Sequence, residues 1–277
     1  MKDFYINSTS QDQSYDYSNI TSIDDKHIKI IHVVTCIIIA IGLPLILLAI
    51  YALYSMVRSD HVAPIYVINL LISDLLQLIS MIVEVAQHVP NKAIHIYYFS
   101  LFASVGFMVC IALGRYLVIA HPLWYRFRRT IKTSVAVCVL VWVLSLVYAV
   151  YVSYVVTNKI LAVLLLLPFP LLIFFLVGTL RALSAAISVP SDEKRRIVGI
   201  LVLVLLIYTL LFLPDIIMLL GASFNKALTI LSLVFLRLSP LADLVLYVFM
   251  RKGAIDKLLA SVCCCRMDSN EISSSSV

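Results

Sequence analysis

The chain has 277 residues, of which 62% are hydrophobic and 13% charged, with a net charge of +6 and a mean hydropathy of +1.05. Soluble domains carry roughly 45–50% apolar and about 25% charged residues. So much apolar surface excludes a single soluble domain and makes lipid the solvent. The basic residues lie in short loops between apolar runs, so a topological cause fits better than nucleic-acid binding, and no nucleic-acid partner is expected.

Seven apolar runs follow one another, each at or above the about 20 residues that a helix needs to cross the hydrocarbon core. They cover residues 30–57, 63–89, 94–120, 132–156, 159–184, 194–221 and 225–249. The predicted fold class is an all-α membrane protein, a seven-transmembrane helix bundle with a short amphipathic eighth helix. Residues 1–29 are interpreted as an extracellular tail, 30–249 as the helix domain, and 250–277 as the amphipathic helix and cytoplasmic tail.

The first segment is predicted to lie outside the cell. With that orientation, 14 Lys and Arg residues fall on the cytoplasmic side and 6 on the other. Positive loops stay inside, so the N-terminus is expected outside, in the plasma membrane. Two glycosylation triplets, beginning at Asn7 and Asn19, fall on the same side.

Motifs on successive predicted helices carry a family resemblance. The third run ends Gly114-Arg115-Tyr116-Leu117-Val118-Ile119-Ala120-His121-Pro122-Leu123. This resembles the D/E-R-Y-x-x-I-x-x-P-L motif of rhodopsin-like (class A) G-protein-coupled receptors. Further matches, in order along the chain, are Asn69-Leu70 with Asp74-Leu75, Trp142, Pro170, Phe212-Leu213-Pro214 and Asp243 with Tyr247. The chain looks most like the branch that holds nucleotide, protease-activated, proton-sensing and lipid receptors.

The resemblance implies a switch that couples to a heterotrimeric G protein. Arg115 is expected to face the bundle and contact the G protein in the active state; an ordinary positive-inside anchor is the alternative. The same resemblance assigns to the switch Gly114, Tyr116, Pro122, Phe212, Pro214, Asp243 and Tyr247. Gly114 departs from the family, because the acid that pairs with the Arg is missing, and raised basal signalling is therefore expected.

Two mid-helix carboxylates, Asp74 and Asp243, form a predicted ion or proton site. Family alignment adds Ser104 and Ser239, and in relatives this cavity can hold a sodium ion. Oxygen ligands suit a hard cation, and a proton shared between neighbouring carboxylates could replace the ion. A purely structural hydrogen-bonded pair is the alternative, and no other cofactor is expected.

Three charged residues are predicted to face a ligand pocket: Glu84, Asp215 and Arg237. Pairing of Glu84 with Arg237 is favoured over separate ligand contacts, because pairing lowers the cost of burial. Arg237 stands where opsins carry the retinal lysine, and an arginine cannot form that Schiff base, so an opsin is excluded.

Four histidines near the predicted outer helix ends are candidates for pH sensing: His27, His32, His88 and His95. Histidine is the side chain that titrates near pH 6.5. Harmless placement at the membrane interface is the alternative. The expected extracellular ligand is therefore a small molecule, with protons and a lipid among the candidates.

The C-terminal segment suggests membrane attachment. Residues 251–262 predict an amphipathic helix on the inner leaflet, with Cys263, Cys264 and Cys265 as palmitoylation sites. A reduced cytosolic cysteine cluster is the alternative. The polar tail is expected to serve receptor kinases and arrestin, and Ser275-Ser276-Val277 could bind a PDZ protein.

Other classes of function fit less well. A seven-helix transporter or channel usually shows internal repeats, which are not visible in the sequence. A catalytic site would need a nucleophile–base or metal constellation, and none is recognisable, so no enzyme is predicted. A decayed receptor with little signalling is the remaining alternative, since Gly114, Ile46, Leu244, Gly178 and Pro90 all depart from the family pattern.

Overall fold

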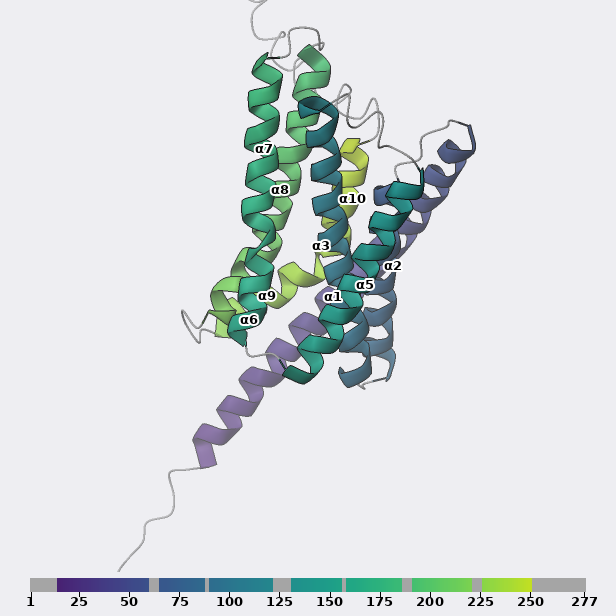
Figure 1. Cartoon of the computed structure of the whole chain (residues 1–277). Coiled ribbons are helices and arrows are strands. Elements are labelled where there is room, and N and C mark those ends of the chain that lie inside the picture. Colours follow the sequence, from purple (N-terminus) through teal and green to yellow (C-terminus); the bar gives the residue numbers. More distant parts are fainter. Residues whose placement is uncertain are drawn as a thin grey trace, which may run out of the picture.

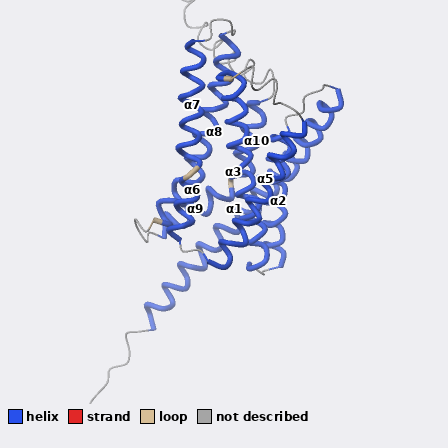
Figure 2. Tube along the Cα trace, viewed as in Figure 1, coloured by secondary structure: helices blue, strands red, loops and turns tan. Residues whose placement is uncertain are grey.

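The computed structural model describes residues 14–59, 65–87, 90–121, 131–155, 158–185, 191–220 and 226–250. Every regular element in these ranges is an α-helix, and the helices pack as one elongated bundle (Figures 1 and 2). The helices are α1 (Ser14–Ser59), α2 (Ile65–Gln87), α3 (Pro90–Ala120), α5 (Ile131–Val155), α6 (Asn158–Leu166), α7 (Pro168–Ala185), α8 (Ser191–Leu219), α9 (Lys226–Arg237) and α10 (Ser239–Met250).

Six spans in the described chain are long and apolar enough to cross a membrane, and the bent pair α9 and α10 makes up to seven. Helices suit this role because each satisfies its own backbone hydrogen bonds in lipid. The predicted all-α, multi-pass membrane fold is confirmed. The predicted eighth helix lies outside the described residues.

Two predicted runs are broken where proline removes a backbone donor. The run 159–184 is split at Leu167 into α6 and α7, next to Pro168 and Pro170, although it still counts as one span from Ala162 to Ser184. The run 225–249 is bent by 45° between α9 and α10, next to Pro240. Proline has no backbone N–H to donate to the preceding turn, which weakens the helix at each place.

The first helix begins earlier than predicted. It starts at Ser14 rather than near residue 30, while its apolar span begins at Lys29. Residues 14–29 contain neither Gly nor Pro, so no residue there ends the helix, and the polar segment continues the apolar one.

Helix α3 occupies the centre of the bundle and packs against α2, α5, α7 and α8 (Figure 1). Large side chains such as Phe107, Tyr208 and Phe212 are fully buried in the core. By contrast, Leu144 and Val147 of α5 are 58% and 59% exposed, as expected of a helix that faces lipid. This arrangement surrounds polar groups on α2, α3 and α10 with apolar side chains.

The two ends of the bundle are named after Glu84 and Arg115, which lie at opposite ends. The Glu84 end contains the end of α2 and the start of α3. The Arg115 end contains the end of α3, the start of α8 and the end of α10, where Arg196 Nη2 donates to the carbonyl of Met250 at 2.5 Å.

Candidate functional site

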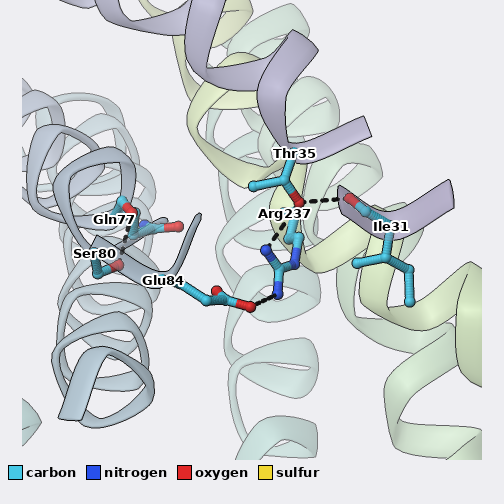
Figure 3. A network of polar contacts seen from close by, with 6 residues as sticks. All are labelled: Ile31, Thr35, Gln77, Ser80, Glu84 and Arg237. Atoms are coloured by element: carbon cyan, nitrogen blue, oxygen red, sulfur yellow. Dashed lines mark hydrogen bonds and ion pairs between the residues drawn. The ribbon is translucent and has the colours of Figure 1, made fainter. Parts of the chain in front are cut away.

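Glu84 and Arg237 form an ion pair at the Glu84 end. Arg237 Nη2 lies 2.6 Å from Glu84 Oε1, and the side chains are 16% exposed for Arg237 and 36% for Glu84. Arg237 Nη1 also donates to Thr35 Oγ1 at 2.9 Å, and Thr35 in turn donates to the carbonyl of Ile31 at 2.7 Å (Figure 3). The predicted pairing is therefore present in the structure, and Thr35 extends it to α1.

Arg237 can bond to groups on α1 and α2 because of its position at the end of α9. It is the last residue of α9, directly before the bend, and α9 contacts α1. One guanidinium has several donors in a fixed fork, so it can bond to α1 and α2 at once. Three helices are thereby joined by a single side chain.

The two predicted carboxylates lie together in the middle of the bundle. Asp74 on α2 and Asp243 on α10 are both fully buried and interact with each other. Ser104 Oγ on α3 donates to Asp243 Oδ2 at 2.7 Å. Ser239, also fully buried, lies four residues before Asp243 on α10, so it is one turn away on the same face.

Several oxygens of this group have no hydrogen-bond partner in the described part of the chain. They are both Asp74 oxygens, Asp243 Oδ1 and Ser239 Oγ. Buried polar atoms are almost always hydrogen-bonded to protein, water or an ion. Carboxylate and hydroxyl oxygens are donors suited to a hard cation or to water.

The third charged residue, Asp215, lies on α8, a helix that carries neither member of the ion pair. It follows Pro214 on α8, is 7% exposed, and interacts electrostatically with the phenols of Tyr97, Tyr98 and Tyr148. Within the described chain the hydroxyl groups of Tyr97 and Tyr148 are buried without a hydrogen-bond partner. Asp215 therefore belongs to an aromatic, polar cluster that includes residues the sequence analysis missed.

Contacts between aromatic rings join the tyrosines of this cluster to one another. Tyr97 and Tyr98 meet edge to face at 5.8 Å between centroids, Tyr98 lies 6.5 Å from Phe102, and Phe102 lies 3.6 Å from Tyr148. The tyrosines were missed because an aromatic residue in an apolar run is usually an ordinary core residue. The unpartnered hydroxyls of Tyr97 and Tyr148 become evident only in three dimensions.

At the Arg115 end, Tyr116 is tightly packed while Gly114 faces open space. The Tyr116 ring contacts Phe174 and Phe175 of α7 at 5.8 and 5.7 Å between centroids. A Cβ at Gly178 would lie 2.6 Å from this ring, whereas a Cβ at Gly114 would meet nothing within 4 Å. Arg115 is partly exposed and contacts neighbouring groups.

The remaining predicted switch residues lie on α8 and α10. Phe212 is fully buried and its ring stacks on Tyr208 at 4.6 Å, Pro214 lies inside α8, and Tyr247 is 9% exposed. Tyr208 donates to the carbonyl of Leu165, next to the break between α6 and α7, at 2.5 Å. The bond joins α8 to the broken span.

Several predicted sites lie outside the described residues or side chains. Of the histidines predicted to sense pH, His32 on α1 and His95 on α3 are both exposed. No side-chain position is described for Asn7, Asn19, His27, His88, Pro122, Cys263, Cys264 and Cys265. Their predicted roles stay predictions.

The described chain combines a bundle of apolar helices, a buried carboxyl pair on α2 and α10, and an Arg-Tyr pair at the end of α3. The model of the family "7 transmembrane receptor (rhodopsin family)" matches residues 45–161, which include Asp74, Glu84, Arg115 and Trp142. The resemblance predicted from the sequence is confirmed over these residues, which are similar to the rhodopsin-like receptors.

Individual relatives cover part of the chain. Mouse G-protein coupled receptor 68 is 30% identical over 138 residues, which are 45% of this chain and 37% of that receptor. Human proteinase-activated receptor 2 is 26% identical over 43% of this chain and 32% of its own length. Mouse lysophosphatidic acid receptor 5 is 30% identical over 53% and 42%. The matched part of the chain thus spans about two fifths of the length of the first of these relatives.

Proposed function

We propose that this chain is a cell-surface receptor that converts binding of an extracellular small ligand into activation of a heterotrimeric G protein. The observation that carries the proposal is the family match over residues 45–161, which contains the Arg115–Tyr116 pair at the end of α3. The relatives named above are all receptors, which supports the same class of function. The proposed orientation, with the N-terminus outside, is supported by the asymmetry of Lys and Arg along the chain.

The proposed ligand region is the cluster of Asp215, Tyr97, Tyr98 and Tyr148. In the proposed orientation it lies toward the outside, as does the Glu84–Arg237 pair. Because Arg237 is already paired with Glu84, Asp215 is left as a buried carboxylate without an ion pair in the described chain. A ligand group that donates hydrogen bonds, or carries positive charge, would compensate it.

The relatives do not single out one ligand. Their names refer to a proteinase and to lysophosphatidic acid, and another relative is a type-1 angiotensin II receptor.

For the carboxyl pair Asp74 and Asp243, we propose a sodium ion or a shared proton. The unpartnered oxygens and the hydroxyls of Ser104 and Ser239 are the donors that support this.

The tail is proposed to engage further partners. Palmitoylation at Cys263–Cys265, receptor kinases, arrestin and a PDZ protein remain part of the proposal on sequence grounds alone. There are two rival functions: a transporter or channel, and a receptor that has lost signalling.

A nucleotide-exchange measurement tests the proposal. The purified chain in lipid nanodiscs is mixed with each class of heterotrimeric G protein, first without ligand, and GTP-analogue uptake is followed. Faster exchange than empty nanodiscs give is expected for at least one class, and Arg115→Ala is expected to abolish it. No acceleration with any class, by a chain whose fold is intact, would contradict G-protein coupling.

A further inference from the structure

His32 and Cys36 contact each other on the exposed surface of α1. They stand four residues apart, so they lie one turn apart on the same face of the helix. Cys36 Sγ lies 3.9 Å from His32 Nδ1, and both residues are exposed. A histidine with its proton on Nε2 has a lone pair on Nδ1, which can accept the proton of the thiol. The two side chains therefore pair a nucleophile with a base.

Cys36 differs from the other cysteines that the structure describes. Cys138 is buried and accepts a hydrogen bond from Asn69 Nδ2 at 3.5 Å, while Cys110 is only partly exposed. Cys36 is exposed and contacts a histidine. A cysteine reacts when its thiol is accessible and a neighbouring group favours loss of the thiol proton. Of the described cysteines, Cys36 meets both requirements.

The surface around Cys36 is apolar. Val33 and Ile37, which flank it on the exposed side of α1, are 56% and 53% exposed. The apolar span begins at Lys29, so Cys36 lies about 10 Å along it, at a rise of about 1.5 Å per residue. An exposed side chain inside an apolar span faces lipid rather than bulk water. A compound that reaches Cys36 must therefore be uncharged and soluble in lipid.

The pair lies at the level of the polar network at the Glu84 end. Thr35, the residue before Cys36, accepts a hydrogen bond from Arg237 Nη1 at 2.9 Å, and Arg237 pairs with Glu84 (Figure 3). Thr35 is fully buried, whereas Cys36 is exposed on the same turn. The thiol is thus near one end of the span, the level at which amphipathic molecules place their polar groups.

We propose that the His32–Cys36 pair is a covalent modification site for a lipid-soluble α,β-unsaturated aldehyde or ketone. His32 Nδ1 takes the thiol proton while Cys36 Sγ forms a bond to the β-carbon of the compound. The electron pair of the carbon–carbon double bond moves toward the carbonyl oxygen as an enolate. The imidazolium then returns the proton to the α-carbon, which restores the carbonyl. The product is a thioether, and the step needs no oxidant, reductant or leaving group.

Reaction of the chain in nanodiscs with nonenal, an uncharged unsaturated aldehyde, tests the proposal. The adduct is located by fragmentation in a mass spectrometer, and its rate of formation at Cys36 is compared between the unmodified chain and His32→Gln. His95→Gln is the matched control, because it makes the same substitution at another exposed histidine, on α3. Thermal unfolding of each variant shows that the compared chains are folded.

The adduct at Cys36 is expected to form at least about tenfold more slowly in His32→Gln, because a positioned general base contributes that much or more. The His95→Gln variant should react as fast as the unmodified chain. Equal rates in His32→Gln and the unmodified chain, or an adduct on His32 with Cys36 left free, would overturn the pair as the reactive site.

A second comparison tests the lipid route with two maleimides, which react by the same addition. One is uncharged N-ethylmaleimide and the other carries a trimethylammonium group, and each rate is divided by the rate with a small free thiol in solution. The charged reagent is expected to modify Cys36 at least about tenfold more slowly, because a charge enters lipid at high cost. Equal relative rates would contradict a lipid-facing site. Neither comparison uses a G protein, so the result does not depend on the proposed coupling.

Discussion

Arg237 shows at the scale of one residue how a charge is accommodated beside lipid. Its side chain is 16% exposed, and its guanidinium bonds to Glu84 and to Thr35, which lie on different helices. The carboxylate of Glu84 neutralises the charge, and Nη1 donates to the hydroxyl of Thr35. Each partner is therefore expected to matter for the stability of the bundle rather than for ligand contact alone.

A charge swap tests this pair. Arg237→Glu leaves two carboxylates facing each other and is expected to reduce surface expression. The cost expected is about 1.5–3 kcal/mol, the range of a hydrogen bond to a charged group, because Glu84 is partly exposed. Adding Glu84→Arg restores an opposite pair and should recover part of the expression, measured by surface labelling of an epitope tag. A double variant no better than the worse single variant would argue against the pairing.

Gly178 is predicted to be required by the packing of Tyr116. In Gly178→Ala the new Cβ would lie 2.6 Å from a ring already held between Phe174 and Phe175, so the ring must move. Overpacking of this kind costs about 1–3 kcal/mol. Thermal unfolding of the purified chain should therefore shift down.

Gly199→Ala is the matched control for that substitution. A Cβ at this glycine meets nothing within 4 Å, and Ala is the better helix former by up to about 1 kcal/mol. This variant should be as stable as the unmodified chain or more so. If the Gly178→Ala variant unfolds at the same temperature as the unmodified chain, the Tyr116 ring moves aside without cost and the prediction is wrong.

At the scale of helices, the apolar runs predicted the spans well but not their breaks. Seven apolar runs of membrane-spanning length correspond to six spans and one bent pair of helices. Length and hydropathy are local properties of the sequence, so they predict that a span exists but not where it bends. The breaks near Pro168 and Pro240 could not be predicted from proline alone, since Pro44 and Pro214 lie inside continuous helices. What differs is the tertiary surroundings, which the sequence does not reveal.

The residues of the candidate site could likewise be predicted only in part from the sequence. The family resemblance placed Asp74, Ser104 and Asp243 in one cavity, and the same resemblance together with the cost of burying charge favoured the Glu84–Arg237 pair. Thr35 was missed because a lone hydroxyl in an apolar helix carries no pattern. Its importance depends on neighbours from other helices.

The break between α6 and α7 offers a test at this scale. Tyr208→Phe removes the hydroxyl that bonds to the Leu165 carbonyl and is expected to cost about 0.5–1.5 kcal/mol. Tyr148→Phe is the control, because the Tyr148 hydroxyl has no hydrogen-bond partner in the described chain. Thermal unfolding should fall for the first variant and stay level or rise for the second. The reverse order would contradict a stabilising role for the bond.

For the whole molecule, the proposed topology puts the N-terminus outside. Glycans at Asn7 and Asn19 should then be removed by glycosidase with a lowered band on a gel, and an N-terminal tag should be stained on intact cells. Staining only after permeabilisation, in chains that reach the surface, would reverse the orientation.

Proton sensing is a second property of the whole molecule to test. Protons activate only if they bind the active state more tightly than the inactive one. If histidines respond, signalling should rise as external pH falls from about 8 to 6, around the pKa of a free histidine near 6.5. Replacing His27, His32, His88 and His95 by Gln should flatten that response at equal surface expression. A flat response of the unmodified chain, with basal activity present, would leave a lipid or another small molecule as the ligand.

Arg115 is proposed to be the G-protein switch, and ligand-free nucleotide exchange with two variants of Gly114 tests this role. The structure leaves open space for a side chain there, so Gly114→Glu can place a carboxylate beside Arg115, while Gly114→Gln adds the same bulk without charge. A restored charge pair worth about 1–2 kcal/mol changes a two-state population by about 5- to 30-fold. We expect Gly114→Glu to lower basal exchange by about that factor relative to Gly114→Gln at equal amounts of folded receptor. Equal basal exchange by the two variants would contradict the assignment of this end of α3 as the switch.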